Sequence, residues 1–124
     1  MKRNSEKYIL TEAINWEELG GGVSRKFLGY DNQIMMVKVK FEEGAKGAPH
    51  KHFHTQATYC VSGRFEFEID GVKQIIKAGD GVYIQPNLLH SAVCLEEGML
   101  IDTFSPVRED FLSGDGVSYF GDKK

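Results

Sequence analysis

The chain has 124 residues, of which 41% are hydrophobic and 27% charged, and its formal net charge is -3 at pH 7. This length suits one domain spanning residues 1–124 and excludes a second domain with a core of its own. The mildly acidic balance, with no basic cluster, argues against nucleic acid or a membrane surface as a partner and favours small-molecule chemistry.

The lack of a recognisable targeting signal and the low cysteine content both favour a reducing compartment. The N-terminal stretch MKRNSEKYILTEAINWEEL lacks an apolar core of signal-peptide length, and no segment approaches the roughly 18 apolar residues of a membrane span. The two cysteines, Cys60 and Cys94, are too few for a disulfide framework. We therefore expect both thiols to be free and the protein to be cytoplasmic.

The N-terminal region carries weak structural signals. Residues 1–10 are polar and aperiodic, which is typical of a loose tail or of an arm that pairs with a partner chain. The next segment, Thr11 to Leu19, predicts a short helix. Three consecutive glycines, 20–22, would end it, because glycine raises the entropy cost of any regular element.

The middle of the chain predicts strands joined by tight turns. Residues 23–30 and 33–41 are rich in strand formers and flank Asp31-Asn32, which predicts a hairpin. Residues 64–70, RFEFEID, alternate strictly, so the apolar side chains share one face. Asp70-Gly71 then predicts a two-residue type I′ turn, which would pair this strand with residues 72–77.

The second half continues the pattern of short strands. We expect strands at residues 81–85, 90–96 and 99–104, separated by turns at Pro86-Asn87 and Glu97-Gly98, and a helical turn at 108–112 after Pro106. In the tail from Ser113 only Val117, Tyr119 and Phe120 could anchor the chain. Eight or more short strands without a long helix predict an all-β fold of jelly-roll type, with its barrel core at about residues 23–105.

A histidine cluster in the stretch Gly44 to Gly63, GAKGAPHKHFHTQATYCVSG, predicts a metal site. His50, His52, His54 and Gln56 fall within seven residues, and neutral imidazoles suit zinc, iron, nickel and copper. On a straight strand His52 and Gln56 would lie about 13 Å apart, too far to share one ion. The chain should therefore fold back through residues 53–55, which puts His54 at the bend and makes it the weakest ligand candidate.

Two further residues have open roles. Asp102 lies in the apolar run from Met99 to Phe104, where a carboxylate is costly without a partner. It is either a structural residue paired with Arg108 or a backbone amide, or a catalytic group. Arg108 either clamps a carboxylate bidentately at the barrel mouth or pairs locally with Glu109 or Asp110.

The spacing of these residues resembles the two motifs of the cupin family. The first motif has a glycine, His-x-His, a glutamate or substitute and a second glycine, and its spacing is matched by Gly44, His50, His52, Gln56 and Gly63. The second motif is matched more loosely by Gly79 and His90, with Cys94 in place of its asparagine. The resemblance implies a cupin-type jelly-roll barrel, or double-stranded β-helix, whose metal ligands are His50, His52, Gln56 and His90. Cys94 could ligate a soft metal as a thiolate, but we expect a buried, inert thiol, which is the commoner role of a lone cysteine.

The segments WEELGGG and FSPVREDF resemble the KdgF family, small cupins of pectin degradation, from about Trp16 to Leu112. Members open 4,5-unsaturated uronate monosaccharides from pectin or alginate into linear 5-keto-4-deoxyuronate. The resemblance places Asp102, Phe104 and Arg108 at positions of catalysis and substrate contact.

The resemblance also sets expectations for the cofactor and the partners. It implies one divalent ion, Zn, Ni, Fe or Mn. Neutral ligands would leave the charge of that ion uncompensated and favour a small anionic sugar as substrate. A homodimer is expected, because small cupins commonly pair through their sheets. The alternatives are an iron-dependent dioxygenase and a sugar-acid-binding cupin without turnover.

Overall fold

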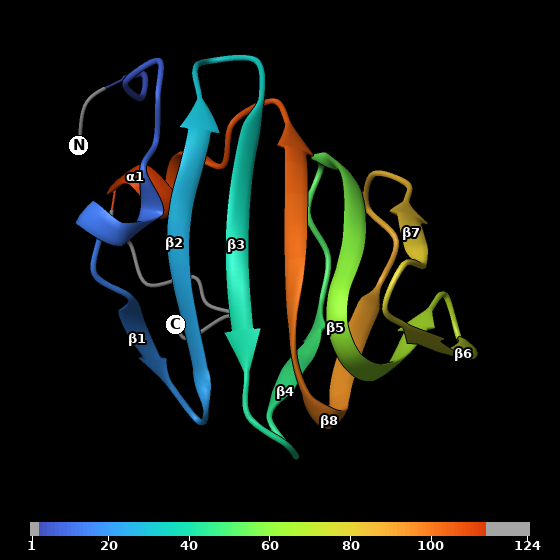
Figure 1. The fold of residues 1–124 in the computed structure, drawn as a ribbon. Helices are drawn as coiled ribbons and strands as arrows, with labels where there is room; N and C mark the ends of the chain where they lie inside the picture. Colours follow the sequence, from blue (N-terminus) through green and yellow to red (C-terminus); the bar gives the residue numbers. More distant parts are fainter. Residues whose placement is uncertain (1–2, 114–124) are drawn as a thin grey trace.

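The computed structural model describes residues 3–113, and its fold is a jelly roll built from one antiparallel sheet (Figure 1). Eight strands in this range follow the order β1-β2-β3-β8-β5-β6, with β4 paired to β8 and β7 paired to β5. Their bounds are β1 Glu17–Gly20, β2 Val23–Tyr30, β3 Met35–Phe41, β4 Lys46–His50, β5 Thr55–Ile69, β6 Val72–Lys77, β7 Gly81–Ile84 and β8 His90–Ser105. A 3-10 turn, η1 Thr11–Ala13, and a short helix, α1 Glu109–Ser113, complete the described chain. The predicted all-β jelly roll is confirmed.

The two long strands, β5 and β8, roll the sheet up, as their curvature in Figure 1 shows. The first part of β5 pairs with β7 and with the last part of β8. The second part pairs with β6 and with the first part of β8. Each long strand therefore belongs to both halves of the barrel, and its inward side chains line one continuous interior.

The turn predicted at Glu97-Gly98 is wrong, because β8 continues from His90 to Ser105 without interruption. At this point β5 and β8 cross so closely that a Cβ on Gly63 would lie 2.6 Å from the carbonyl oxygens of Glu96 and Glu97. A Cβ on Gly98 would collide with the Ser62 carbonyl. The two glycines therefore allow a bend with an irregular register inside both strands, rather than a turn that ends them.

The helix predicted for Thr11–Leu19 is also wrong. Only Thr11–Ala13 is helical, and β1 follows, with Glu17 opposite Arg25 of β2. Trp16 packs on the ammonium groups of Lys26 and Lys40, which lie 4.7 and 4.4 Å from its ring centroid. Pairing with β2 and this cation–π contact override a weak local helix propensity.

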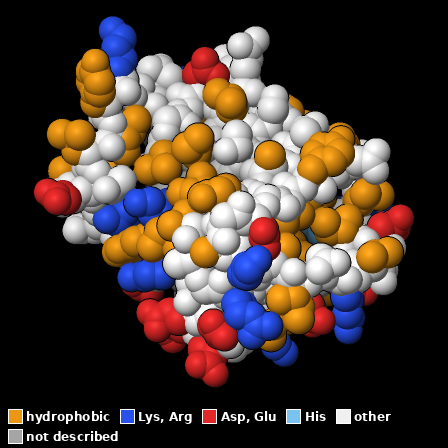
Figure 2. All heavy atoms as spheres, turned by 45° about the vertical axis from the view of Figure 1, so that its right-hand side comes forward, with side chains coloured by type: hydrophobic (Ala, Val, Ile, Leu, Met, Phe, Trp, Pro, Cys, Tyr) orange, Lys and Arg blue, Asp and Glu red, His pale blue; other side chains and the backbone are white. Residues whose placement is uncertain are grey.

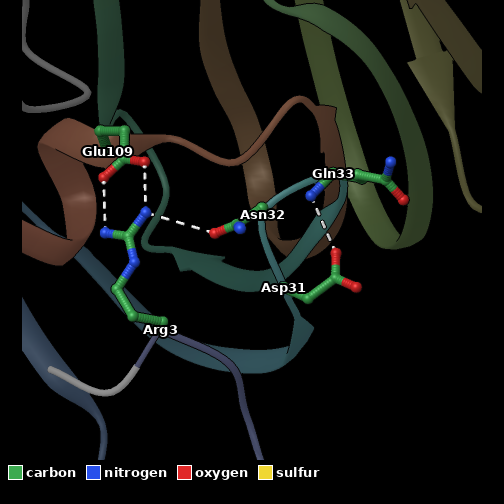
Figure 3. Close-up of polar contacts among 5 residues, drawn as sticks. All are labelled: Arg3, Asp31, Asn32, Gln33 and Glu109. Atoms are coloured by element: carbon green, nitrogen blue, oxygen red, sulfur yellow. Dashed lines mark hydrogen bonds and ion pairs between the residues drawn. The ribbon is translucent and has the colours of Figure 1, made fainter.

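The N-terminal arm contacts its own chain. The Ser5 amide donates a 2.9 Å hydrogen bond to the Tyr30 carbonyl. Arg3 donates to both carboxylate oxygens of Glu109, at 3.0 and 2.9 Å, and to Asn32 Oδ1 (Figure 3). The arm thus links the β2–β3 turn to the start of α1, close in the chain to Arg108.

The core follows the predicted alternation. Inward residues of β3 are Met35, Val37, Val39 and Phe41, all at most 3% exposed. Asp70 and Gly71 both have positive φ, as the predicted I′ turn requires. Several large apolar side chains of β5, β6 and β7 remain exposed. Figure 2, in which the side of the molecule that carries these strands comes forward, shows apolar patches on the surface. The predicted tail anchors Val117, Tyr119 and Phe120 lie outside the described residues. Among the described residues, no helix is long and apolar enough to cross a membrane.

The strand crossing predicts a difference between two glycine substitutions. Gly44 and Gly63 both have positive φ, +86° and +82°, but a Cβ on Gly44 meets nothing within 4 Å. Gly44→Ala should therefore lower the free energy of unfolding only by the backbone strain, about 1–2 kcal/mol. Gly63→Ala should lower the free energy of unfolding by about 1–3 kcal/mol more, because its methyl group also meets backbone atoms. Urea unfolding of the two variants measures the difference, and equal losses would contradict the steric account.

Candidate metal centre

Three histidines meet at one end of the barrel. His50 ends β4, His52 lies in the loop that follows, and His90 begins β8 directly opposite His50. One ring nitrogen of each lies within 4.8 Å of those of the other two. The chain bends through Phe53 and His54 and returns along β5, as predicted. Residues forty positions apart in the sequence are thereby brought into one cluster.

The backbone selects which nitrogen each ring presents. His50 Nδ1 lies 2.8 Å from the Ala48 carbonyl oxygen, and His90 Nδ1 lies 2.9 Å from that of Leu88. His52 Nδ1 makes the equivalent contact, 3.2 Å, with the carbonyl of His54. A carbonyl only accepts, so in His50 and His90 Nδ1 carries the proton and Nε2 keeps a lone pair, and in His52 the His54 carbonyl can accept the proton from Nδ1 in the same way. His90 Nε2 is buried and has no hydrogen-bond partner.

The environment keeps these imidazoles neutral. Burial lowers the pKa of His52 to about 3, and the positive charge of Arg108 adds to this effect. Burial likewise lowers the pKa of His90 to about 4 and lowers that of His50. Neutral rings with converging lone pairs are the form that binds a divalent metal.

Gln56 brings a fourth donor atom to the cluster. It is inward on β5, 6% exposed, and its Oε1 lies 3.0 Å from His52 Nε2. The neutral His52 ring has one proton for two accepting oxygens, the His54 carbonyl at 3.2 Å and Gln56 Oε1 at 3.0 Å. With the proton on Nδ1, Nε2 and Oε1 both offer lone pairs, and a cation bound to both would remove their repulsion. Their separation suits neighbouring ligands of one ion with bonds of about 2.1 Å. The donor set His50, His52, Gln56 and His90 therefore fits a divalent ion.

Asp102 and Thr58 lie beneath Gln56 in the interior, and both are 4% exposed. Thr58 Oγ1 donates a 2.7 Å hydrogen bond to Asp102 Oδ1, and Gln56 Nε2 lies 3.0 Å from Thr58 Oγ1. The structure thus places Asp102 at the site, with hydroxyl and amide donors beside it. Sequence reasoning missed Thr58. The alternation that makes Gln56 inward on β5 also makes Thr58 inward and could have found it.

Arg108 is 3% exposed and is held by a local pair, one of the two roles left open by the sequence. Its Nε and Nη2 donate to the two carboxylate oxygens of Asp110 at 3.0 and 2.7 Å. Its guanidinium also packs on the rings of Phe104 and Phe111, at 5.0 and 4.2 Å from their centroids. A bidentate clamp through Nε and Nη2 is therefore not available while Asp110 is bound. Nη1 is the nitrogen left to meet a ligand.

A cavity of about 30 Å³ connects these groups. Its polar lining comes from His50, Gln56, His90, Ser91, Asp102 and Arg108, and Phe104 contributes an apolar wall. This volume has room for a small group such as a water molecule or an ion. A larger ligand has to widen it.

His54 and Cys94 do not belong to the three-histidine group, although the His54 ring centroid lies 5.3 Å from that of His52. His54 is buried and stacks on Phe53, with ring centroids 4.0 Å apart. Cys94 is 1% exposed, and its Sγ contacts the Glu96 carbonyl oxygen at 3.0 Å. Burial raises the pKa of the Cys94 thiol to about 11, which disfavours the thiolate that a metal requires. Cys60 and Cys94 are both free, as predicted.

The first test of the site compares histidines inside and outside the group. His90→Ala removes one converging lone pair and should abolish stoichiometric binding of Co²⁺ or Zn²⁺. His54→Ala leaves the three rings in place and should retain it. Elemental analysis of the folded variants checks both, and full metal content in His90→Ala would show that the ion is held elsewhere.

The lowered pKa values make the pH dependence of the site specific. Metal affinity should change little between pH 8 and pH 5, because His52 and His90 take up protons only near pH 3 to 4. In the unfolded chain a histidine has its ordinary pKa of 6.5, so between pH 6.5 and 4 it binds a proton that His52 and His90 in the folded protein do not bind. These two residues should therefore lower the stability of the metal-free protein as pH falls from about 6.5 toward 4. Metal titrations and melting curves across this range measure both effects, and a tenfold loss of affinity by pH 6 would contradict the neutral-ring account.

Comparison with known proteins agrees with this geometry. The model of the family described as "Cupin domain" matches residues 37–103. The pectin degradation protein KdgF of Dickeya dadantii (strain 3937) is 48% identical over 108 residues, 86% of this chain and 98% of that protein. The structure of an RmlC-like cupin from Shewanella frigidimarina NCIMB 400 superposes with a TM-score of 0.87 at 44% identity and covers 89% of this chain and 99% of that one.

The structure of KdgF from Halomonas sp. is also similar, with a TM-score of 0.83 and 36% identity over 86% of this chain and 99% of that one. These relatives match nearly their whole length, so the likeness includes the barrel and the ends of its strands. The chain therefore belongs to the cupin family and, within it, to the small single-domain cupins of the KdgF type.

Proposed function

We propose that the chain is a metal-dependent enzyme of pectin or alginate catabolism that converts 4,5-unsaturated uronate monosaccharides into linear 5-keto-4-deoxyuronate. The observation that carries the proposal is one cavity in which two histidines of the three-histidine group, His50 and His90, lie with a buried carboxylate, Asp102, and a buried guanidinium, Arg108. The 48% identity to a protein named for pectin degradation supports the substrate class.

The residues that would hold the ion are His50, His52, His90 and Gln56. All four ligands are neutral, so the bound ion would keep its double charge, attract an anionic substrate and polarise a substrate oxygen as a Lewis acid. The proposal therefore needs an ion at this end of the barrel and an acidic sugar as its ligand.

The reaction is an isomerisation in which atoms and electrons balance within the sugar. The hydroxyl on C1 loses a proton, the bond from C1 to the ring oxygen breaks, and C1 becomes an aldehyde. The ring oxygen stays on C5, whose enol then becomes a ketone as C4 gains a proton. One proton leaves an oxygen and one arrives at a carbon, so no oxidant or second substrate is required.

Asp102 is the group proposed to move both protons. Its carboxylate would take the proton from the C1 hydroxyl and return a proton to C4. It lies in the cavity and is 4% exposed, so water competes little for these transfers. The hydrogen bond from Thr58 fixes the position of Oδ1.

Arg108 and Phe104 are proposed to bind and orient the sugar. The Arg108 guanidinium, fixed by Asp110 and by two aromatic rings, would meet the substrate carboxylate through Nη1. Phe104 would pack against the sugar as an apolar wall. A uronate ring exceeds a cavity of about 30 Å³, so substrate binding must widen the space around these side chains.

Two other functions are separated from this one by simple measurements. A dioxygenase would consume oxygen with its substrate, whereas the proposed isomerisation consumes none. A sugar-acid-binding cupin would bind unsaturated uronate without loss of the absorbance of its conjugated double bond. Loss of that absorbance without oxygen uptake is the expected result, and stable absorbance with bound uronate would overturn the proposal.

Asp102 and Arg108 should give different kinetic defects. Asp102→Asn removes the proton acceptor and, assayed at saturating metal, should lower turnover by roughly a hundredfold or more with little change in substrate binding. Arg108→Ala removes a charged contact and should weaken substrate binding by about 2 to 3 kcal/mol, seen first as a raised KM.

Melting temperature and metal content of both variants show whether a defect is structural. The exposed pair Arg64–Glu96 offers a matched control, because Arg64→Ala removes a guanidinium that does not line the cavity and should keep wild-type kinetics. Native turnover in Asp102→Asn would exclude Asp102 as the proton carrier.

The homodimer expected from the sequence remains a proposal. β1 is the terminal strand in the sheet order, and a terminal strand leaves backbone groups that a second copy could cover. Light scattering at micromolar concentration should give the mass of two chains. The mass of one chain would remove the homodimer from the proposal.

A further inference from the structure

A chain of buried hydrogen bonds runs from Gln56 through Thr58 to Asp102, next to the three histidines. Thr58 Oγ1 is 2.7 Å from Asp102 Oδ1, and Gln56 Nε2 is 3.0 Å from Thr58 Oγ1 and 3.5 Å from Asp102 Oδ1. All three side chains are at most 6% exposed. Water cannot easily replace any of these contacts, so the three groups must satisfy one another.

The chemistry of the three groups gives the set a direction. Asp102, as a carboxylate, only accepts, and the short 2.7 Å contact is typical of a hydroxyl donating to a charged oxygen. The Thr58 hydroxyl has one proton and donates it to Asp102, so Thr58 can only accept a hydrogen bond from Gln56. The amide nitrogen of Gln56 must then face Thr58, and its carbonyl oxygen must face the histidines.

We propose that Thr58 is a positioning residue that holds the Gln56 carbonyl oxygen toward the group of His50, His52 and His90. In the opposite orientation the Gln56 amide nitrogen would lie beside His52 Nε2 and donate to it. That hydrogen bond would occupy the lone pair that a metal ion requires. By accepting from the amide, Thr58 stabilises the orientation in which Gln56 is a ligand and His52 stays available.

The inference rests on the proposed metal centre and deepens it by separating two tasks that meet at Asp102. The same Oδ1 that receives the Thr58 proton belongs to the carboxylate proposed to move protons on the substrate. Substituting Asp102 disturbs both tasks at once. Substituting Thr58 leaves the carboxylate in place and disturbs only the orientation of Gln56.

The test uses metal binding without substrate. Thr58→Val keeps the β-branched shape but has no hydroxyl, and its Co²⁺ affinity should fall by roughly 10-fold or more. Thr58→Ser keeps the hydroxyl and should bind within about threefold of the wild type. Thr103→Val removes a hydroxyl from the outward face of neighbouring β8 and should change nothing. Competition titrations with Co²⁺ and Zn²⁺ measure all four proteins.

A merely structural threonine would behave differently. It would lower the melting temperature of the metal-free Thr58→Val protein and leave its Co²⁺ affinity unchanged, and that result would overturn the proposal. If Thr58→Val does not fold, Thr58→Ala also lacks the hydroxyl, does not place a second methyl against the Asp102 carboxylate, and carries the same expectation. None of these measurements uses the sugar substrate. A wild type that binds Co²⁺ but does not turn over uronate would therefore reject the proposed function and leave this inference standing.

Discussion

Burial of polar side chains inside the barrel is the constraint on which the site depends. Along β3 every inward position is apolar, whereas β5 places Gln56 and Thr58 inward and β8 places Asp102 opposite Thr58. A polar group in such a place costs several kcal/mol unless it is hydrogen-bonded. The Thr58–Asp102 and Gln56–Thr58 contacts meet that requirement, and in doing so they leave the Gln56 carbonyl oxygen facing the histidines.

The charges of the side chains around the cavity are also balanced by their surroundings. The three imidazoles are neutral because burial and the charge of Arg108 both disfavour their protonation, with burial the larger cause. Arg108 itself is balanced by Asp110, whose pKa is lowered despite partial burial because Arg108 bonds to its carboxylate. An ion bound by neutral ligands would then leave this end of the barrel with a net positive charge, even beside the Asp102 carboxylate, which suits an acidic substrate.

The segment that carries Arg108 is held from several sides. Phe104 and Phe111 pack on the guanidinium, and the N-terminal arm reaches the adjacent Glu109 through Arg3 (Figure 3). The Arg3–Glu109 pair is exposed and adds little stability by itself. The buried Arg108–Asp110 pair and the aromatic contacts therefore determine where the guanidinium points. Nη1 is left as the contact for a ligand.

Local sequence determined those features that depend on neighbouring residues. Asp70-Gly71 specifies its turn because both residues tolerate positive φ, and the alternation in RFEFEID specifies an inward Phe65 and Phe67 because side chains alternate across a strand. The close spacing of His50, His52 and Gln56 likewise specifies a bend and a ligand cluster.

Tertiary structure decided what depends on distant partners. Glu97-Gly98 looks like a turn until Gly63 of another strand is seen to pass against it, and Thr11–Leu19 looks helical until Glu17 pairs with β2. Thr58 carries no motif, and its contact with Asp102, 44 residues away, exists only once β5 and β8 are paired. Hydrogen bonding and close packing act between atoms in contact. Residues far apart in the chain acquire a role only when the fold brings them together.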